Sequence, residues 1–205
     1  MDCFELIKAI AEILLALVAI VISIIALKQT RTQIVLSNKQ QLMDRRLDNY
    51  SLVSGLIENY SSVREKIDFD NLDNTLENVL RSLQYRTELL VMGMFSTPKD
   101  SVAFLNDINI RMAKLHRTSK ELPIIFKNDD VKVIASFLEN LSSFLLCGIT
   151  YTVYLKFPID KRKDVESDMI KAKDTLLRAY SETEKQFNQI ETTNAVENLL
   201  KQIEL

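Results

Sequence analysis

The sequence predicts an all-α protein with one helix that spans a membrane. Residues 9–27 read AIAEILLALVAIVISIIAL, nineteen residues with a single charge at Glu12. The 205-residue chain holds only three glycines and three prolines, so few positions interrupt a helix. Beyond the apolar stretch, apolar residues recur at helical spacing along most of the chain. We therefore expect an extracytoplasmic tail over 1–8, a transmembrane helix over 9–27, a stalk helix over 28–66 and a cytosolic helical bundle over 67–205.

The apolar stretch has the length of a membrane span. At about 1.5 Å per residue, it forms a helix of roughly 28 Å, close to the thickness of the hydrocarbon core. The residues before it are acidic, and Ile24–Lys28 offers no small-x-small cleavage site, so we expect a retained anchor rather than a signal peptide. Only Lys8 is basic on the N-terminal side, whereas five bases follow between Lys28 and Arg46. This asymmetry predicts a cytoplasmic body and an N-terminus outside the membrane.

Capping and breaking residues divide the rest of the chain. Thr97 and Pro98 together form a helix start signal, while Pro123 and Pro158 each predict a stop. The helices expected after the span cover residues 28–66, 72–94, 97–120, 128–157 and 160–205. The apolar run Phe144–Leu155 covers only about 18 Å as a helix, which favours a buried bundle helix. A second span or a re-entrant segment is the alternative for this run.

One face of the span carries only small or acidic residues. In alternating steps of four and three, this face comprises Glu12, Ala16, Ala19, Ser23 and Ala26. Small residues allow helices to approach closely in a membrane, so we expect the protein to form a homo-oligomer through its span and stalk. Two interpretations remain open: a dry structural seam, or a pore lined by this face. Glu12 would lie near the outer mouth of the pore, or it could snorkel to the membrane surface.

A basic cluster lies in the middle of the chain. Its four members recur every three residues: Arg111, Lys114, Arg117 and Lys120. The cluster could bind an anionic nucleotide or oligonucleotide through its phosphates, or it could be a solvated helix face. The net charge of -2 provides no overall field to attract nucleic acid.

The sequence carries no motif for catalysis or for a cofactor. His116 is the only histidine, and the two cysteines, Cys3 and Cys147, form no metal-binding pattern. We expect Cys147 to be a small core residue. No phosphate-binding or dinucleotide-binding glycine motif is present. We therefore expect no enzyme activity, no cofactor and no metal site.

The segment Leu17–Tyr50 resembles the N-terminal part of small bacterial membrane proteins. Its characteristic run is SNKQQLMDRRL at residues 37–47, which lies in the stalk that continues from the span. The layout as a whole resembles the channel-type membrane effector of the Hailong anti-phage system. That resemblance implies an oligomer of single-span subunits in the bacterial inner membrane, with a helical cytosolic chamber. It also implies a nucleotidyltransferase partner whose DNA oligomer holds the channel shut, with the small-residue face at the pore and a basic cluster on the oligonucleotide.

Architecture and resemblance together predict an ion pore gated by a cytosolic nucleotide or oligonucleotide and used in anti-phage defence. The alternative is a membrane-anchored scaffold that conducts no ions and recruits a cytosolic partner.

Overall fold

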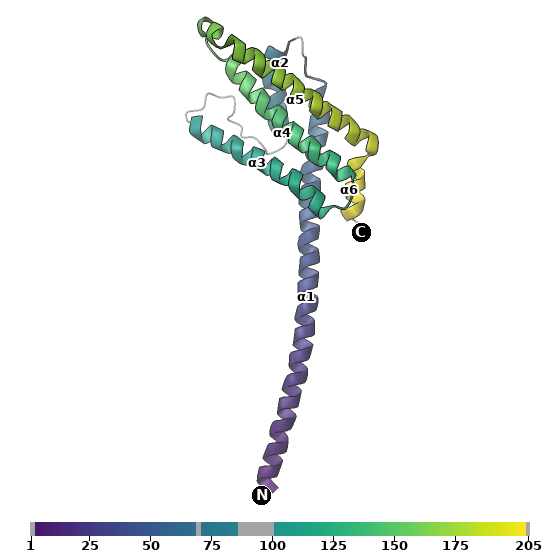
Figure 1. Cartoon of the computed structure of the whole chain (residues 1–205). Coiled ribbons are helices and arrows are strands. Elements are labelled where there is room, and N and C mark those ends of the chain that lie inside the picture. Colours follow the sequence, from purple (N-terminus) through teal and green to yellow (C-terminus); the bar gives the residue numbers. More distant parts are fainter. Residues whose placement is uncertain (1–2, 69–70, 86–100, 204–205) are drawn as a thin grey trace. The chain divides into compact units, whose positions relative to one another are not determined.

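A computed structural model describes residues 3–68, 71–85 and 101–203, and these contain helices but no strand (Figure 1). The helices are α1 (Cys3–Arg64), α2 (Leu72–Tyr85), α3 (Ser101–Ile125), α4 (Asp130–Leu155), the 3-10 helix η1 (Ile159–Val165), α5 (Glu166–Thr193) and α6 (Ala195–Ile203). The predicted all-α class is confirmed. The chain divides into two compact units, Met1–Asp44 and Arg45–Leu205. Helix α1 contributes to both units, so the predicted stalk over 28–66 extends across the boundary between them.

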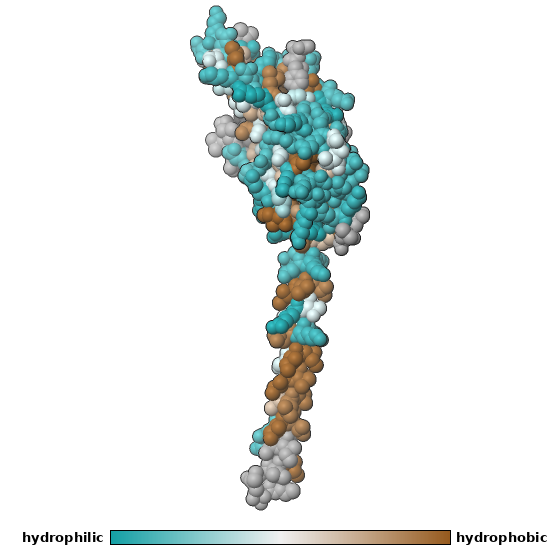
Figure 2. All heavy atoms as spheres, turned by 45° about the vertical axis from the view of Figure 1, so that its right-hand side comes forward, coloured by the Kyte–Doolittle hydropathy of each residue, from teal (hydrophilic) through white to brown (hydrophobic). Residues whose placement is uncertain are grey.

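The first unit contains the N-terminal part of α1, whose described apolar side chains are exposed. Every side chain from Glu12 to Asp44 is exposed. Figure 2 shows a band of apolar residues around this part of the helix. In the described ranges, two helices are long and apolar enough to cross a membrane, α1 from Glu12 onward and α4. None of the apolar window in α1 is buried, whereas 44% of the window in α4 lies inside the protein.

Helix α4 is central to the second unit. The run Phe144–Leu155, for which a buried helix was expected, buries Phe144, Leu145, Ile149 and Tyr151 in the core. Cys147 is half-buried and packs against the same core. The bundle therefore uses much of this apolar run for its own packing.

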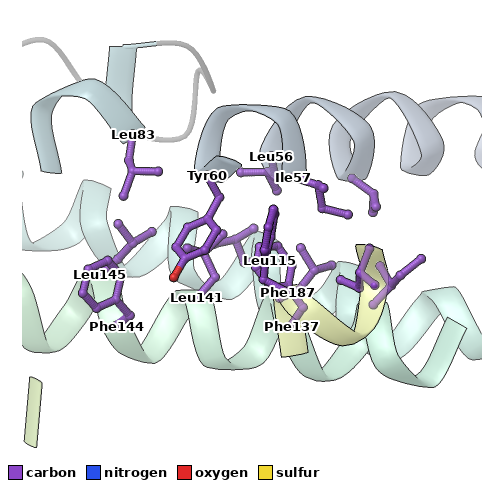
Figure 3. Packing of buried hydrophobic residues seen from close by; sticks show 14 of the residues in the cluster. Leu56, Ile57, Tyr60, Leu83, Leu115, Phe137, Leu141, Phe144, Leu145 and Phe187 are labelled. Carbon is purple, nitrogen blue, oxygen red and sulfur yellow. The ribbon is translucent and has the colours of Figure 1, made fainter. Parts of the chain in front are cut away.

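Three aromatic rings join α1, α4 and α5. The ring of Tyr60 lies 5.5 Å from that of Phe137 and 5.2 Å from that of Phe187, and the rings of Phe137 and Phe187 are 6.1 Å apart (Figure 3). All three side chains are at most 1% exposed. Tilted and edge-on contacts at these distances add to the stabilisation from burial.

A glycine allows α2 to approach α4 closely. A Cβ atom on Gly148 would lie 3.0 Å from Cδ2 and 3.1 Å from Cδ1 of Leu80. Leu80 is fully buried, so its side chain has little room to move. The close approach therefore depends on glycine at this position.

Arg46 links α1 to the ends of two later helices. Its Nε donates a 2.9 Å hydrogen bond to the carbonyl of Ile125, and its Nη1 donates a 3.1 Å bond to the carbonyl of Gln202. The guanidinium also lies 5.8 Å from the centre of the Phe126 ring. Through Arg46, α1 supplies hydrogen-bond donors to terminal carbonyls that helices leave without intrahelical partners.

Two predicted helix boundaries are wrong. A stop was expected at Pro123, but α3 continues to Ile125, and Phe126 N–H still bonds to the Leu122 carbonyl at 3.0 Å. Proline removes one hydrogen bond, and the burial of Leu122, Ile125 and Phe126 holds the last turn in place.

The predicted last helix, 160–205, is divided into η1, α5 and α6. Asn194 has the left-handed values φ 51° and ψ 39°, which end α5. Ala195, Leu199 and Ile203 of α6 are then buried against the core, so burial compensates for the break. The expected helix start at Thr97 and residues 86–94 of the expected second helix lie outside the described residues.

Candidate functional site

The small-residue face is fully accessible on α1. Ala16, Ala19, Ser23 and Ala26 are all exposed, as is Glu12. The Ser23 hydroxyl donates a 2.8 Å hydrogen bond to the carbonyl of Ala19, four residues earlier. The helix thus satisfies this hydroxyl proton internally, which allows Ser23 to lie in an apolar environment. Its oxygen can still accept a bond from water, so the geometry suits both the seam and the pore.

The four predicted anion-binding residues do not all belong to one site. The side chain of Arg111 lies outside the described part of the chain. Lys120 Nζ forms a 2.6 Å ion pair with Oε1 of Glu139 on α4, and the Ser119 hydroxyl donates to the same oxygen at 3.2 Å. The hydrogen bond from Lys120 holds the pKa of the Glu139 carboxyl below its usual value. Lys120 therefore joins α3 to α4.

Lys114 and Arg117 line a groove between α3 and α1. The groove has a volume of about 560 Å³. Its lining residues are Arg45, Asp48, Asn49, Ser51 and Leu52 from α1, and Lys114, Arg117, Thr118 and Glu121 from α3. We call this the α1–α3 groove. All its residues belong to the second compact unit.

Charges within the α1–α3 groove are only partly paired. Arg117 Nε forms a 2.9 Å ion pair with Oε1 of Glu121, one turn further along α3. Among the described residues, the side chains of Arg45 and Lys114 have neither an ion-pair nor a hydrogen-bond partner. Within the described residues, the groove thus presents two cations without a partner, one from each of two helices.

This arrangement suits a ligand with a phosphate and with hydrogen-bond donors. An arginine binds a phosphate through two parallel N–H groups, and a lysine adds a point charge. Asp48 lines the same groove and can accept hydrogen bonds from hydroxyl or amino groups. A nucleotide carries both kinds of group. The volume lies within the usual range for small-ligand sites.

Arg45 and Asp48 were not predicted from the sequence as members of this site. They precede Lys114 by more than sixty residues, and no local pattern connects the two segments. The only sequence feature that could have indicated a site here was the doublet Arg45-Arg46. Its two arginines have different environments. Arg46 bonds to backbone carbonyls of the bundle, while Arg45 faces the groove.

No group of three or more His, Cys, Asp or Glu side chains in the described residues is arranged to hold a metal ion. His116 is exposed on α3. Burial raises the pKa of the Cys147 thiol.

In comparisons with known proteins, the chain matched no family model, no curated protein and no solved structure.

Proposed function

We propose that the protein is a self-associating, single-span membrane protein that forms an ion pore gated by an anionic ligand. The observation that carries this proposal is the exposure of every side chain from Glu12 to Leu27. An apolar helix without cover in its own chain is stable in lipid or against other copies. The span would lie in the bacterial inner membrane, with the N-terminus outside and the bundle in the cytoplasm.

The small-residue face supports association of the spans. In lipid, no hydrophobic force brings helices together, so contact depends on close packing between small side chains. Ala16, Ala19, Ser23 and Ala26 supply such a surface. With several copies around an axis, Ser23 would present its oxygen to water and Glu12 would add negative charge at one mouth.

The α1–α3 groove supports control by a ligand. Arg45 and Asp48 of this groove belong to α1, the helix that also carries the span. A nucleotide or oligonucleotide that bridges Arg45 and Lys114 would favour one arrangement of α1 and α3. A ligand shifts such an equilibrium only by the difference in its affinity for the two states. The resemblance of residues 17–50 and of the overall layout to channel-type anti-phage effectors supports a role in bacterial defence.

Ion flux through liposomes that contain the full-length protein tests this proposal. We expect flux, either at rest or after addition of nucleotide-containing cell extract, and we expect Ala19→Leu with Ser23→Leu to abolish it. The control is Val18→Leu with Val21→Leu, which places leucine at two positions on another face of the same helix. A bilayer that stays tight under all conditions, with the protein inserted, would contradict the pore and favour the scaffold that conducts no ions.

A further inference from the structure

Two buried polar side chains form the floor of the α1–α3 groove. Asn49 of α1 is 8% exposed and Thr118 of α3 is 6% exposed, and both line the groove. The charged lining residues Arg45, Asp48 and Lys114 are exposed. Four lining residues from each helix follow the spacing i, i+3, i+4 and i+7, which places them on one face of that helix. The groove therefore has a polar floor beneath a charged rim.

The hydroxyl group of Thr118 differs from those of the other described threonines. It has no hydrogen-bond partner among the described residues. Each of the others donates to the carbonyl four residues earlier in its helix, and these are Thr30, Thr32, Thr75, Thr150, Thr152, Thr175, Thr183, Thr192 and Thr193. Such an internal bond is a common way for a helix to satisfy a threonine hydroxyl. The Thr118 hydroxyl thus remains able to donate and to accept.

The side-chain oxygen of Asn49 also lacks a partner within the described part of the chain. Its Nδ2 donates a 2.9 Å hydrogen bond to the Arg45 carbonyl, which leaves Oδ1 to accept. In the described ranges, the side-chain atom that is both fully enclosed and unpaired is Oδ1 of Asn59, so the oxygens of Asn49 and Thr118 reach open space. Buried polar groups in native proteins are almost always hydrogen-bonded. A molecule bound in the groove would supply the missing partners.

We infer that the groove binds one mononucleotide, with its phosphate at the rim and its hydroxyl or amino groups at the floor. The inference rests on the proposed function and narrows its ligand from a nucleotide or oligonucleotide to a single nucleotide. Arg45 and Lys114 supply positive charge for the phosphate. Asn49 Oδ1 and the Asp48 carboxylate only accept, so the ligand must carry donors, as a ribose and an amino-bearing base do. Leu52, which is partly buried, adds apolar contact for the face of a base.

An oligonucleotide fits the groove less well. Proteins bind single strands through a track of cations and through aromatic side chains on which the bases stack. Among the described residues that line the groove, none is aromatic, and Asp48 and Glu121 interrupt the cations. The volume of about 560 Å³ suits a small molecule. A strand held by its phosphates on the rim would leave the floor without partners.

Calorimetric titration of the full-length protein in lipid nanodiscs tests the inference. The probes are the four common ribonucleoside monophosphates, with ribose phosphate and inorganic phosphate as partial ligands. We expect at least one mononucleotide to bind more tightly than either partial ligand, because only the mononucleotide also places a base in the groove. Equal affinities for ribose phosphate and for every mononucleotide would overturn the assignment to a nucleotide.

Substitutions of Thr118 test the role of the floor. Thr118→Val should weaken mononucleotide binding by about fivefold and leave phosphate binding unchanged, since it replaces one neutral hydrogen-bonding group by a methyl group. Thr118→Ser keeps the hydroxyl and should retain the affinity. The matched control is Thr152→Val, because Thr152 is 5% exposed but donates a 2.8 Å bond to the Gly148 carbonyl, outside the groove. An unchanged affinity in Thr118→Val, or an equal loss in the control, would overturn this role.

The same titrations separate this inference from the proposed function. If Arg45→Gln and Lys114→Gln weaken binding but Thr118→Val does not, the anion site stands and the inference about the floor fails. Tighter binding of a short single-stranded DNA than of any mononucleotide would overturn the inference and leave gating by an oligonucleotide intact. Ion flux without binding of any mononucleotide would overturn the inference but not the pore. Binding that depends on Thr118, in a protein that conducts no ions, would support the inference and count against the pore.

Discussion

The phenol group of Tyr60 donates a 2.7 Å hydrogen bond to Oε1 of Glu184, which joins the C-terminal part of α1 to α5. The other oxygen of the same carboxylate lies 3.6 Å from Nη1 of Arg64, and the Arg64 guanidinium lies 4.4 Å from the centre of the Phe187 ring. One carboxylate thus serves two α1 side chains, one turn apart. Burial and the bond to Glu184 raise the pKa of Tyr60 well above its usual value.

Loss of the Tyr60 hydroxyl should weaken the bundle. We expect Tyr60→Phe to lower the free energy of unfolding by about 1 kcal/mol, because the ring packing stays and one buried hydrogen bond is lost. Chemical denaturation of the detergent-solubilised protein, followed by circular dichroism, measures the change. Tyr50→Phe is the matched control, because the Tyr50 hydroxyl has no hydrogen-bond partner among the described residues. Equal losses from both substitutions would contradict the role given to the bond with Glu184.

Two glycine substitutions should have opposite effects. Gly148→Ala places a methyl group 3.0 Å from Leu80, and overpacking of this kind costs about 1–3 kcal/mol. Gly55→Ala adds a methyl group with no atom within 4 Å, so it should stabilise α1 by about 0.5–1 kcal/mol. Thermal unfolding of the two variants beside the unmodified protein measures both effects. An increase in stability from Gly148→Ala would show that Leu80 can move aside.

The bundle should lose stability at alkaline pH. Burial, followed by the charge of Glu184, raises the pKa of Tyr180 to about 12, whereas an unfolded chain has a tyrosine pKa near 10. The fold thus favours the neutral phenol, so this contribution is complete below pH 10 and is lost as the pH rises toward 12. Unfolding measurements across this range, with tyrosinate absorbance, test the expectation. Tyr180→Phe should flatten part of the decline, and an unchanged profile would contradict the assignment to Tyr180.

Binding at the α1–α3 groove should depend on Arg45 and Lys114. We expect Arg45→Gln and Lys114→Gln each to weaken binding of a fluorescent nucleotide by about tenfold, since a charged hydrogen bond contributes about 1.5 kcal/mol or more. High salt should weaken binding of the unmodified protein as well. Fluorescence anisotropy measures the affinities. Lys120→Gln is the control, because Lys120 pairs with Glu139 outside the groove, and an equal loss there would count against this site.

Local sequence signals predicted the helices well and their long-range neighbours poorly. The start of α4 at Asp130 and its end before Pro158 agree with the expected range. The reason is that a charged residue at the start of a helix and a proline after its end each act only on the neighbouring turn. The break at Asn194 has a weaker signal, since asparagine only tolerates the left-handed region and burial of α6 decides the outcome. Some residues come together only because separate helices pack against each other. Examples are Arg45 with Lys114 in one groove and Lys120 with Glu139 in an ion pair. Spacing along one helix cannot reveal such pairs.

The bonds of Arg46 have a consequence for the order in which the protein forms. Ile125 and Gln202 follow Arg46 by 79 and 156 residues, so the ribosome must synthesise both before the guanidinium has its partners. The apolar stretch of α1 leaves the ribosome much earlier and can enter the membrane while the rest is still being made. Contacts between such distant residues form slowly, because a long loop must close first. Under the proposed function, each copy is therefore anchored in the membrane during synthesis, before its bundle closes, and copies that meet at this stage associate through their spans first.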